Sequence, residues 1–123
     1  MRADLPATTG PREVVERFNA AFGDHDVPAA LSLTTEDCVF EDTAPPYGVR
    51  HVGREAVRRS WEALFDGAPA ARFHAEELFV AGDRVVVRWL YSWGDGEDER
   101  IRGVDLFTVR DGLVSEKAAY VKG

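Results

Sequence analysis

Hydrophobic residues in the first half of the chain recur at the spacing of α-helices. A helix is predicted to begin at Gly10-Pro11, because proline is favoured in the first turn. Its apolar face consists of residues one helical turn apart, namely Val14, Val15, Phe18, Ala21 and Phe22. Asp26 can cap a second, short helix. The same spacing predicts a third helix over residues 53–65.

The second half of the chain changes to the spacing of β-strands. Residues 38–42 predict a short strand, and residues 43–52 a loop that contains proline and glycine. Four longer strands are predicted, at residues 72–80, 84–93, 100–110 and 113–122. The short turns between them require antiparallel neighbours. This order of elements predicts an α+β domain, with three helices packed on a strongly curved, mainly antiparallel sheet.

The predicted strand over residues 84–93 alternates between two faces. One face carries Val85, Val87, Trp89, Tyr91 and Trp93, and we expect it to look toward the helices. The opposite face, continued on the next strand, also carries apolar residues, namely Val86, Leu90, Val104 and Leu106. A sheet that is apolar on both faces needs a second cover. A homodimer formed through this outer face is the simplest cover.

Composition and charge exclude several classes of protein. The 123 residues suffice for one domain, predicted over residues 10–123 after a loose tail at residues 1–9. A formal net charge of −7 argues against a nucleic-acid partner, which would need a clustered basic surface. No segment resembles a signal peptide or is apolar enough to cross a bilayer, so no membrane association is expected. Cys38 is the only cysteine, which fits a reducing, cytoplasmic compartment.

The motifs that bind common cofactors are not found in the chain. There is no glycine-rich phosphate loop, so no nucleotide cofactor is expected. His25 and His51 are in predicted loops, without a second ligand at metal-binding spacing, so no metal is expected. Any activity is therefore predicted to use side chains alone.

Two aspartates stand in apolar surroundings. Asp42 ends the strand-like run at residues 38–42, and Asp105 lies inside the run Gly103-Val104-Asp105-Leu106-Phe107. A carboxylate among apolar side chains is costly unless it is paired, hydrogen-bonded or protonated. If both carboxyl groups face one apolar hollow, their surroundings can push their pKa values apart and make one a base and the other an acid. Alternatively, one caps a loop and backbone donors satisfy the other.

The order of the elements, together with several short motifs, resembles the superfamily of nuclear transport factor 2, ketosteroid isomerase and the SnoaL-like polyketide cyclases. The matching segments are Val14-Val15-Glu16-Arg17-Phe18, Val39-Phe40-Glu41-Asp42, Gly53-Arg54-Glu55-Ala56-Val57, and Gly103-Val104-Asp105-Leu106-Phe107 followed by Asp111-Gly112. The likeness spans about residues 11–122. It implies a cone-shaped α+β barrel, in which three N-terminal helices pack on the curved sheet.

The resemblance also implies roles for single residues. By position, Asp42 is similar to the general base of ketosteroid isomerases, and Asp105 to their protonated aspartic acid, which donates a hydrogen bond to the enolate oxygen. Two tyrosines of that family are replaced here, by Phe18 and Trp61. Since loss of one oxyanion donor costs about 10²–10³ in rate, steroid isomerisation is disfavoured. SnoaL-like cyclases use an acidic residue in ring closure, and Asp105 can supply it.

Aromatic residues are candidates for the walls of a ligand pocket. Trp89 and Tyr91 lie on the predicted inner face, where an aromatic core explains them nearly as well. Phe18 and Trp61 are expected to close the pocket from the helices.

Two further residues depend on the path of a loop or turn. Tyr47 follows two prolines and can either close the mouth of the pocket or anchor its loop. If Gly82-Asp83 is a two-residue turn, His74 lies opposite Tyr91 and faces the pocket. Otherwise His74 is a surface or core histidine.

Three functions fit these features. The first is an isomerase or cyclase that transfers a proton on a small apolar carbonyl compound, using Asp42 and Asp105. The second is a non-catalytic binding protein for a small apolar ligand in the same pocket. The third is an interaction module whose conical pocket holds no ligand, since this fold hosts all three kinds of function.

Overall fold

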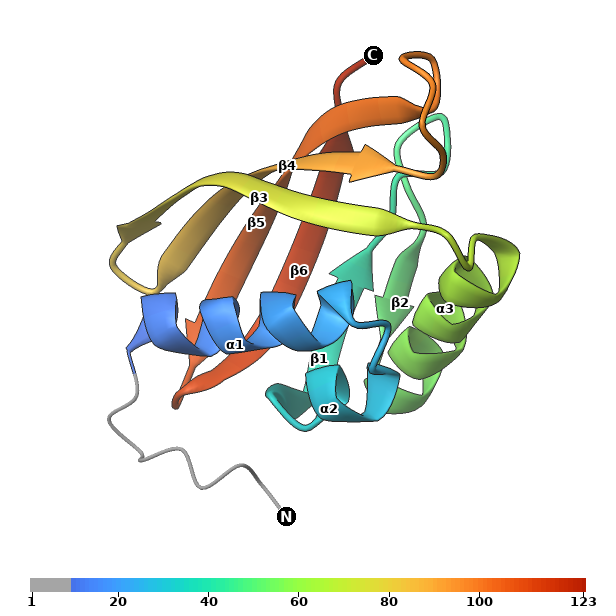
Figure 1. Ribbon diagram of the computed structural model, residues 1–123. Helices are drawn as coiled ribbons and strands as arrows, with labels where there is room; N and C mark the ends of the chain where they lie inside the picture. Colours follow the sequence, from blue (N-terminus) through green and yellow to red (C-terminus); the bar gives the residue numbers. More distant parts are fainter. Residues whose placement is uncertain (1–9) are drawn as a thin grey trace.

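The computed structural model describes residues 10–123, and the predicted tail at residues 1–9 lies outside the described residues. The helices of this part are α1 (Pro11–Gly23), α2 (Val27–Leu31) and α3 (Arg54–Gly67). Its strands are β1 (Thr34–Glu41), β2 (Arg50–Val52), β3 (Arg72–Ala81), β4 (Arg84–Ser92), β5 (Arg100–Arg110) and β6 (Leu113–Val121). Figure 1 shows the helices gathered along one side of the long, twisted strands.

The helices begin within one residue of the predicted positions, and α3 continues two residues beyond its predicted end at Phe65. Pro11 stands at the start of α1, and the side chain of Asp26 caps α2 by accepting a hydrogen bond of 3.1 Å from the backbone N–H of Ala29. The buried face of α1 is the predicted one, with Phe18 and Phe22 at its centre. Within residues 10–123, no helix is both long enough and apolar enough to span a membrane.

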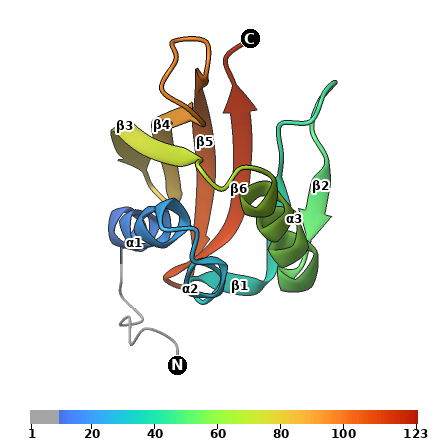
Figure 2. The ribbon, with the colours of Figure 1, turned by 45° about the vertical axis from the view of Figure 1, so that its right-hand side comes forward.

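The six strands form one open sheet in the order β2-β1-β6-β5-β4-β3. Neighbouring strands run antiparallel, except β1 and β6, which run parallel. The sheet curls around the helices, and its edge strands β2 and β3 do not pair with each other (Figure 2). The α+β class and the curved, mainly antiparallel sheet are therefore confirmed, and the expected barrel is an unclosed one.

Two strand boundaries differ from the prediction. β1 begins at Thr34 and not at Cys38, because Thr34 is buried and pairs with Val114 of β6. β2 lies inside the predicted loop, because His51 and its neighbours pair with the end of β1. These pairings set Asp42 just beyond the end of β1, at the start of the connection to β2.

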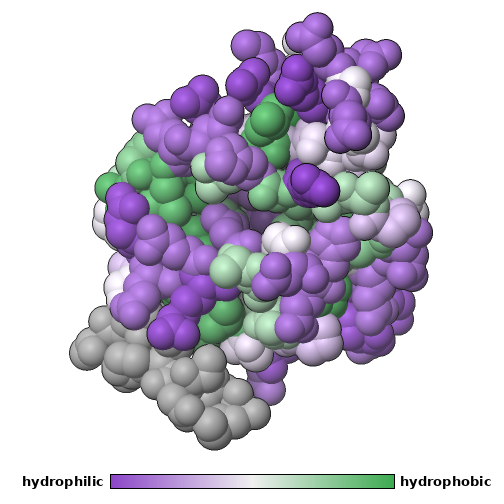
Figure 3. Space-filling model, in the orientation of Figure 1, coloured by the Kyte–Doolittle hydropathy of each residue, from purple (hydrophilic) through white to green (hydrophobic). Residues whose placement is uncertain are grey.

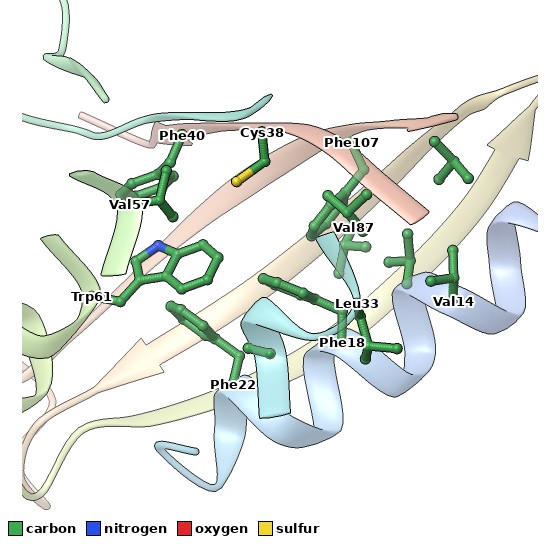
Figure 4. Packing of buried hydrophobic residues seen from close by; sticks show 14 of the residues in the cluster. Val14, Phe18, Phe22, Leu33, Cys38, Phe40, Val57, Trp61, Val87 and Phe107 are labelled. Carbon is green, nitrogen blue, oxygen red and sulfur yellow. The ribbon is translucent and has the colours of Figure 1, made fainter. Parts of the chain in front are cut away.

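Aromatic side chains from the helices and the sheet meet in the core, as Figure 4 shows. The ring centroid of Phe18 lies 5.4 Å from that of Trp61 and 5.5 Å from that of Phe107, both in edge-to-face arrangements. Phe22 meets Trp61 edge-on at 5.4 Å. Such contacts between α1, α3 and β5 fix the helices against the inner face of the sheet.

The outer face of the sheet is half-buried and mixed in character. Its apolar residues are Val86, Leu90, Val104 and Leu106, each partly accessible. Ion pairs lie beside them, from Arg102 Nε to Glu76 Oε1 at 2.8 Å and from Arg88 Nε to Glu77 Oε1 at 3.3 Å. Figure 3 shows a different face, with α1 in front as in Figure 1, and this face is largely hydrophilic, with hydrophobic groups showing between the polar ones.

Candidate functional site

A cavity of about 580 Å³ lies between the inner face of the sheet and α3, and we call it the central cavity. Its apolar walls include Phe22, Phe40, Phe73, Trp89, Tyr91 and Ile101. Its polar lining includes two acid–base pairs, Asp42 with His51 and Asp105 with Lys117. The volume and the apolar walls with a few polar groups are typical of a small-molecule site.

The structure brings Asp42, Asp105, Trp89 and Tyr91 to the central cavity, as the strand alternation predicts. Trp89 of β4 pairs with Gly103 of β5, and Asp105 stands two residues further along β5. A Cβ atom at Gly103 would lie 2.4 Å from Cη2 of the indole. The absence of a side chain at position 103 therefore leaves the space in which the indole of Trp89 forms part of the wall.

The Asp42 carboxylate is held by a cage of hydrogen-bond donors. Its Oδ1 accepts from the backbone N–H of Ala44 at 3.0 Å and of Val49 at 2.7 Å, and its Oδ2 accepts from His51 Nε2 at 3.0 Å. Gly48 has a φ of 88°, and a Cβ there would lie 2.5 Å from the backbone oxygen of Asp42. Glycine therefore lets the chain fold back so closely that Val49 reaches the carboxylate.

Opposing influences act on the pKa of Asp42. Partial burial, the largest single influence, raises it, but the hydrogen bonds from His51, Ala44 and Val49 together outweigh burial and lower the pKa below its ordinary value. Asp42 is therefore an anion at neutral pH. Because the anion accepts a hydrogen bond from Nε2 of His51, the basic nitrogen of the neutral imidazole is Nδ1.

The Asp105–Lys117 pair is almost sealed inside the protein. Lys117 Nζ lies 3.7 Å from Asp105 Oδ2, and the side chains are 6% and 10% exposed, respectively. Oδ1 of Asp105 and Nε1 of Trp89 are buried and have no hydrogen-bond partner within the described part of the chain. An unpartnered buried polar atom is unusual in a protein and marks a place where a ligand can supply the missing contact.

Burial shifts the pKa values of Asp105 and Lys117 in the directions that favour their uncharged forms. Desolvation raises the pKa of Asp105, and the attraction of the nearby Lys117 offsets only part of that rise. Desolvation likewise lowers the pKa of Lys117, against the attraction of Asp105. The central cavity thus contains one carboxyl group with a lowered pKa and one with a raised pKa.

Four of the predicted site residues do not line the central cavity. Phe18 and Trp61 are 0% and 1% exposed and belong to the core, where the helix faces point them, so the expectation that they close the pocket is wrong. Phe22, one turn after Phe18 on α1, lines the cavity in their place. Tyr47 is 86% exposed and borders a separate, neighbouring hollow.

The prediction for His74 is also corrected. Ala81 pairs with Arg84, so the turn at Gly82-Asp83 has two residues. An irregularity between Ala75 and Glu77 then shifts the register by one residue. His74 consequently lies opposite Leu90 and not Tyr91, and its side chain is exposed.

Sequence reasoning missed His51 and Lys117, the partners of the two aspartates. His51 was expected in a loop, but its position in β2 brings it beside Asp42. Lys117 reaches Asp105 because β6 pairs with β5 and places Lys117 and Ala119 on the cavity side of the sheet. The sequence does contain a signal for Lys117. Residues two apart on a strand point to the same face, and Lys117 stands two residues before the apolar Ala119 on the predicted last strand.

The chain is similar to one family of known domains in sequence and to several solved structures in fold. The family model of the SnoaL-like domain matches residues 15–117. Among curated proteins, none is significantly similar to the chain. The chain is similar to the crystal structure of an NTF2-like protein of unknown function from Mesorhizobium loti, with 46% identity, a TM-score of 0.79, and coverage of 92% of this chain and 91% of that one.

Two further structures share the fold. A candidate polyketide cyclase from Sinorhizobium meliloti is 26% identical, with a TM-score of 0.76 over 97% of this chain and 98% of that one. A candidate ketosteroid isomerase from Kribbella flavida is 22% identical, with a TM-score of 0.77 over 92% of this chain and 78% of that one. The second likeness concerns the fold alone.

Proposed function

Since the chain belongs to the SnoaL-like domain family, we propose that it transfers a proton on a small apolar carbonyl compound, as an isomerase or a cyclase. One observation carries the proposal: Asp42, with a lowered pKa, and Asp105, with a raised pKa, border the same apolar cavity. Proton transfer next to a carbonyl needs a base and an acid together: the Asp42 anion can support a basic His51, and the Asp105 carboxyl group can act as the acid. The likeness to a candidate polyketide cyclase supports the same class of reaction.

The base in this proposal is the Asp42–His51 pair. The oxygens of Asp42 already accept three hydrogen bonds, and its lowered pKa makes it a weak base by itself. His51 lines the cavity and stacks on Phe40, with ring centroids 5.8 Å apart. Nδ1 of His51 takes the proton from carbon, and Asp42 orients the ring and stabilises the imidazolium that forms.

The acid in this proposal is Asp105. Its Oδ1 has no partner among the described residues and borders the cavity, so a ligand oxygen can accept its proton there. A neutral carboxyl group in apolar surroundings donates a strong hydrogen bond to the negative charge that develops on a carbonyl oxygen. Lys117 Nζ lies 3.7 Å from Oδ2 of Asp105 and borders the same part of the cavity.

Exchange of α-protons tests the proposal. A ring ketone such as 4-phenylcyclohexanone is incubated with the protein in deuterated buffer, and loss of its α-proton signals is followed by NMR. Asp42→Asn and His51→Gln should each slow exchange at least about 100-fold, with binding nearly unchanged. Binding is measured by the rise in melting temperature that a ligand of the native state must produce. His74→Gln, at an exposed position outside the cavity, is the matched control and should exchange like the parent.

The outcomes separate the three functions. A ketone that binds and does not exchange supports the binding protein, and a full panel of ring ketones without any thermal shift supports the interaction module. If His51→Gln exchanges as fast as the parent, the base has been assigned to the wrong residue.

We also propose a homodimer through the outer face of the sheet. Its half-buried apolar residues are Val86, Leu90, Val104 and Leu106, opposite the cavity-lining face. Stable interfaces of this kind bury roughly 1,200–2,000 Å² in total. A dimer mass is expected by light scattering at micromolar concentration, and a monomer mass would rule the interface out.

A further inference from the structure

Lys117 is a lysine in an unusual position, in the middle of β6 and almost entirely inside the protein. Its side chain is 6% exposed, although lysine is seldom buried to this degree. It borders the central cavity, so a ligand there can reach it. The chain has one other lysine, Lys122, which is exposed and lies beyond the end of β6.

The amine of Lys117 is surrounded by weak partners. Nζ lies 4.3 Å from the ring centroid of Phe22 and 4.8 Å from that of Phe40. Its distance of 3.7 Å from Asp105 Oδ2 is well beyond the roughly 2.7–2.9 Å of a strong charge-assisted hydrogen bond. Among the described residues, Asp105 is the only carboxylate at ion-pair distance. The amine can therefore leave these contacts for a reaction partner without breaking a short hydrogen bond.

Burial favours the reactive form of this amine. An ordinary lysine, with a pKa of about 10.4, is almost fully protonated at neutral pH and is then no nucleophile. Desolvation lowers the pKa of Lys117, and the neighbouring Asp105 reverses only part of that effect. A desolvated lysine in an apolar pocket is the usual form of an amine nucleophile for carbonyl compounds.

We propose that Lys117 condenses with the aldehyde or ketone group of small apolar ligands in the central cavity, forming an imine between Nζ and the carbonyl carbon. The inference rests on the carbonyl ligand of the proposed function, but it does not depend on proton transfer by Asp42 and His51.

Asp105 donates and takes back the protons that this reaction needs. The lone pair of Nζ attacks the carbonyl carbon, and the carbonyl oxygen takes the proton of the Asp105 carboxyl group. The new C–N bond leaves a positive nitrogen, which returns one proton to the Asp105 carboxylate and gives a neutral carbinolamine. Asp105 then protonates the hydroxyl group, the C–O bond breaks, and the nitrogen lone pair forms the C=N bond. The products are water, a protonated imine on Lys117 and the Asp105 carboxylate, which lie side by side as an ion pair.

Reductive trapping tests this reaction. The probe is benzaldehyde with sodium cyanoborohydride at neutral pH, and the products are located by intact mass and peptide mapping. The Lys122→Arg variant keeps the cavity unchanged and has Lys117 as its only lysine. It should gain one benzyl group on Lys117, at a rate that saturates with aldehyde concentration. Mapping separates this product from any at the amino terminus.

The parent chain provides an internal comparison, which needs no variant at the buried position. Lys117 should be labelled at least about tenfold faster than the exposed Lys122, the factor expected for each unit by which its pKa is lowered. Toluene is an apolar competitor of similar size to benzaldehyde but without a carbonyl group, and it should slow labelling of Lys117 and leave Lys122 unaffected.

Two results would overturn the inference: Lys117 stays unlabelled at saturating benzaldehyde, or Lys122 reacts as fast as Lys117. The two proposals fail separately. Labelling of Lys117 in a protein that exchanges no α-protons contradicts only the proton-transfer function, and exchange without labelling contradicts only the imine.

Discussion

Asp42 and Asp105 are the same type of residue and border the same cavity, yet their surroundings shift their pKa values in opposite directions. Asp42 follows the end of β1, where the backbone N–H groups of Ala44 and Val49 are free to donate to its carboxylate. Asp105 lies within β5, where the backbone pairs with β4 on one side and β6 on the other. Its ionisable partner is the side chain of Lys117, whose Nζ lies 3.7 Å from Oδ2, a distance longer than a hydrogen bond.

In this cavity, position relative to a strand explains the direction in which the pKa of each carboxyl group moves. Beyond a strand end, the loop turns its own donors onto the carboxylate and the pKa falls. In mid-strand, the backbone donors are used by the sheet, so desolvation dominates and the pKa rises. One cavity that spans both positions therefore borders one carboxyl group with a lowered pKa and one with a raised pKa.

The largest expected effect comes from breaking the Asp105–Lys117 pair. Lys117→Met leaves the buried, protonated carboxyl group of Asp105 without its polar partner and should lower the free energy of unfolding by about 3 kcal/mol. The double variant Asp105→Leu with Lys117→Met replaces the pair by apolar groups of similar size, and it should recover most of that loss. Urea unfolding at neutral pH measures both. A double variant as unstable as the single one would mean that the packing of Lys117, and not the isolated carboxyl group, causes the loss.

Much of the fold and half of the candidate site could be predicted from the sequence. Period-two alternation places Trp89 and Tyr91 on the inner face, and the same rule on the next strand brings Asp105 beside them. Alternation is robust because a slip of one residue would expose the whole apolar face. Asp42 could be found because the strand before it carries a clear apolar pattern.

The remaining residues depend on features that a single sequence does not encode locally. The register of His74 was decided by an irregularity at Glu76, in the middle of β3, and not by the turn that sequence rules address. Phe18 and Trp61 lie on the same helix faces as the cavity residues Phe22 and Leu64. The spacing along a helix does not show which residues of one face are fully buried and which border a cavity. Lys117 meets Asp105 through strand pairing between β5 and β6, whose register shifts between Thr108 and Val109.

The next largest effect on stability is expected from a change at Gly103, in the cavity wall beside Asp105. Gly103→Ala would place a Cβ 2.4 Å from Cη2 of Trp89 and 2.4 Å from the backbone oxygen of Tyr120, so the indole must move. Overpacking of this kind should cost about 1–3 kcal/mol of unfolding free energy and change the tryptophan fluorescence. Gly67→Ala, where an added Cβ meets nothing within 4 Å, is the matched control. Equal stability of the two variants would show that Trp89 and its neighbours make room for the added methyl group without a cost in unfolding free energy.

The smallest effect concerns the cage around Asp42, and it depends on pH. Because the folded-state pKa of Asp42 lies below its ordinary value of 3.8, this group stabilises the fold above that value and loses its contribution as the pH falls through the folded pKa. Asp42→Asn removes the titration. The parent should therefore exceed the variant by about 1 kcal/mol near pH 6, and the difference should shrink toward pH 3.

Urea unfolding of both proteins at the two pH values measures this difference. Asp95→Asn, at an exposed position in the turn between β4 and β5, controls for the removal of one negative charge from a chain of net charge −7. Its difference from the parent should stay nearly constant, because Asp95 accepts no comparable set of hydrogen bonds in the described structure. If the Asp42→Asn difference grows as the pH falls, the cage does not hold a carboxylate. The difference between Asp42 and Asp105 would then come from their different burial alone, and not from hydrogen bonds to Asp42.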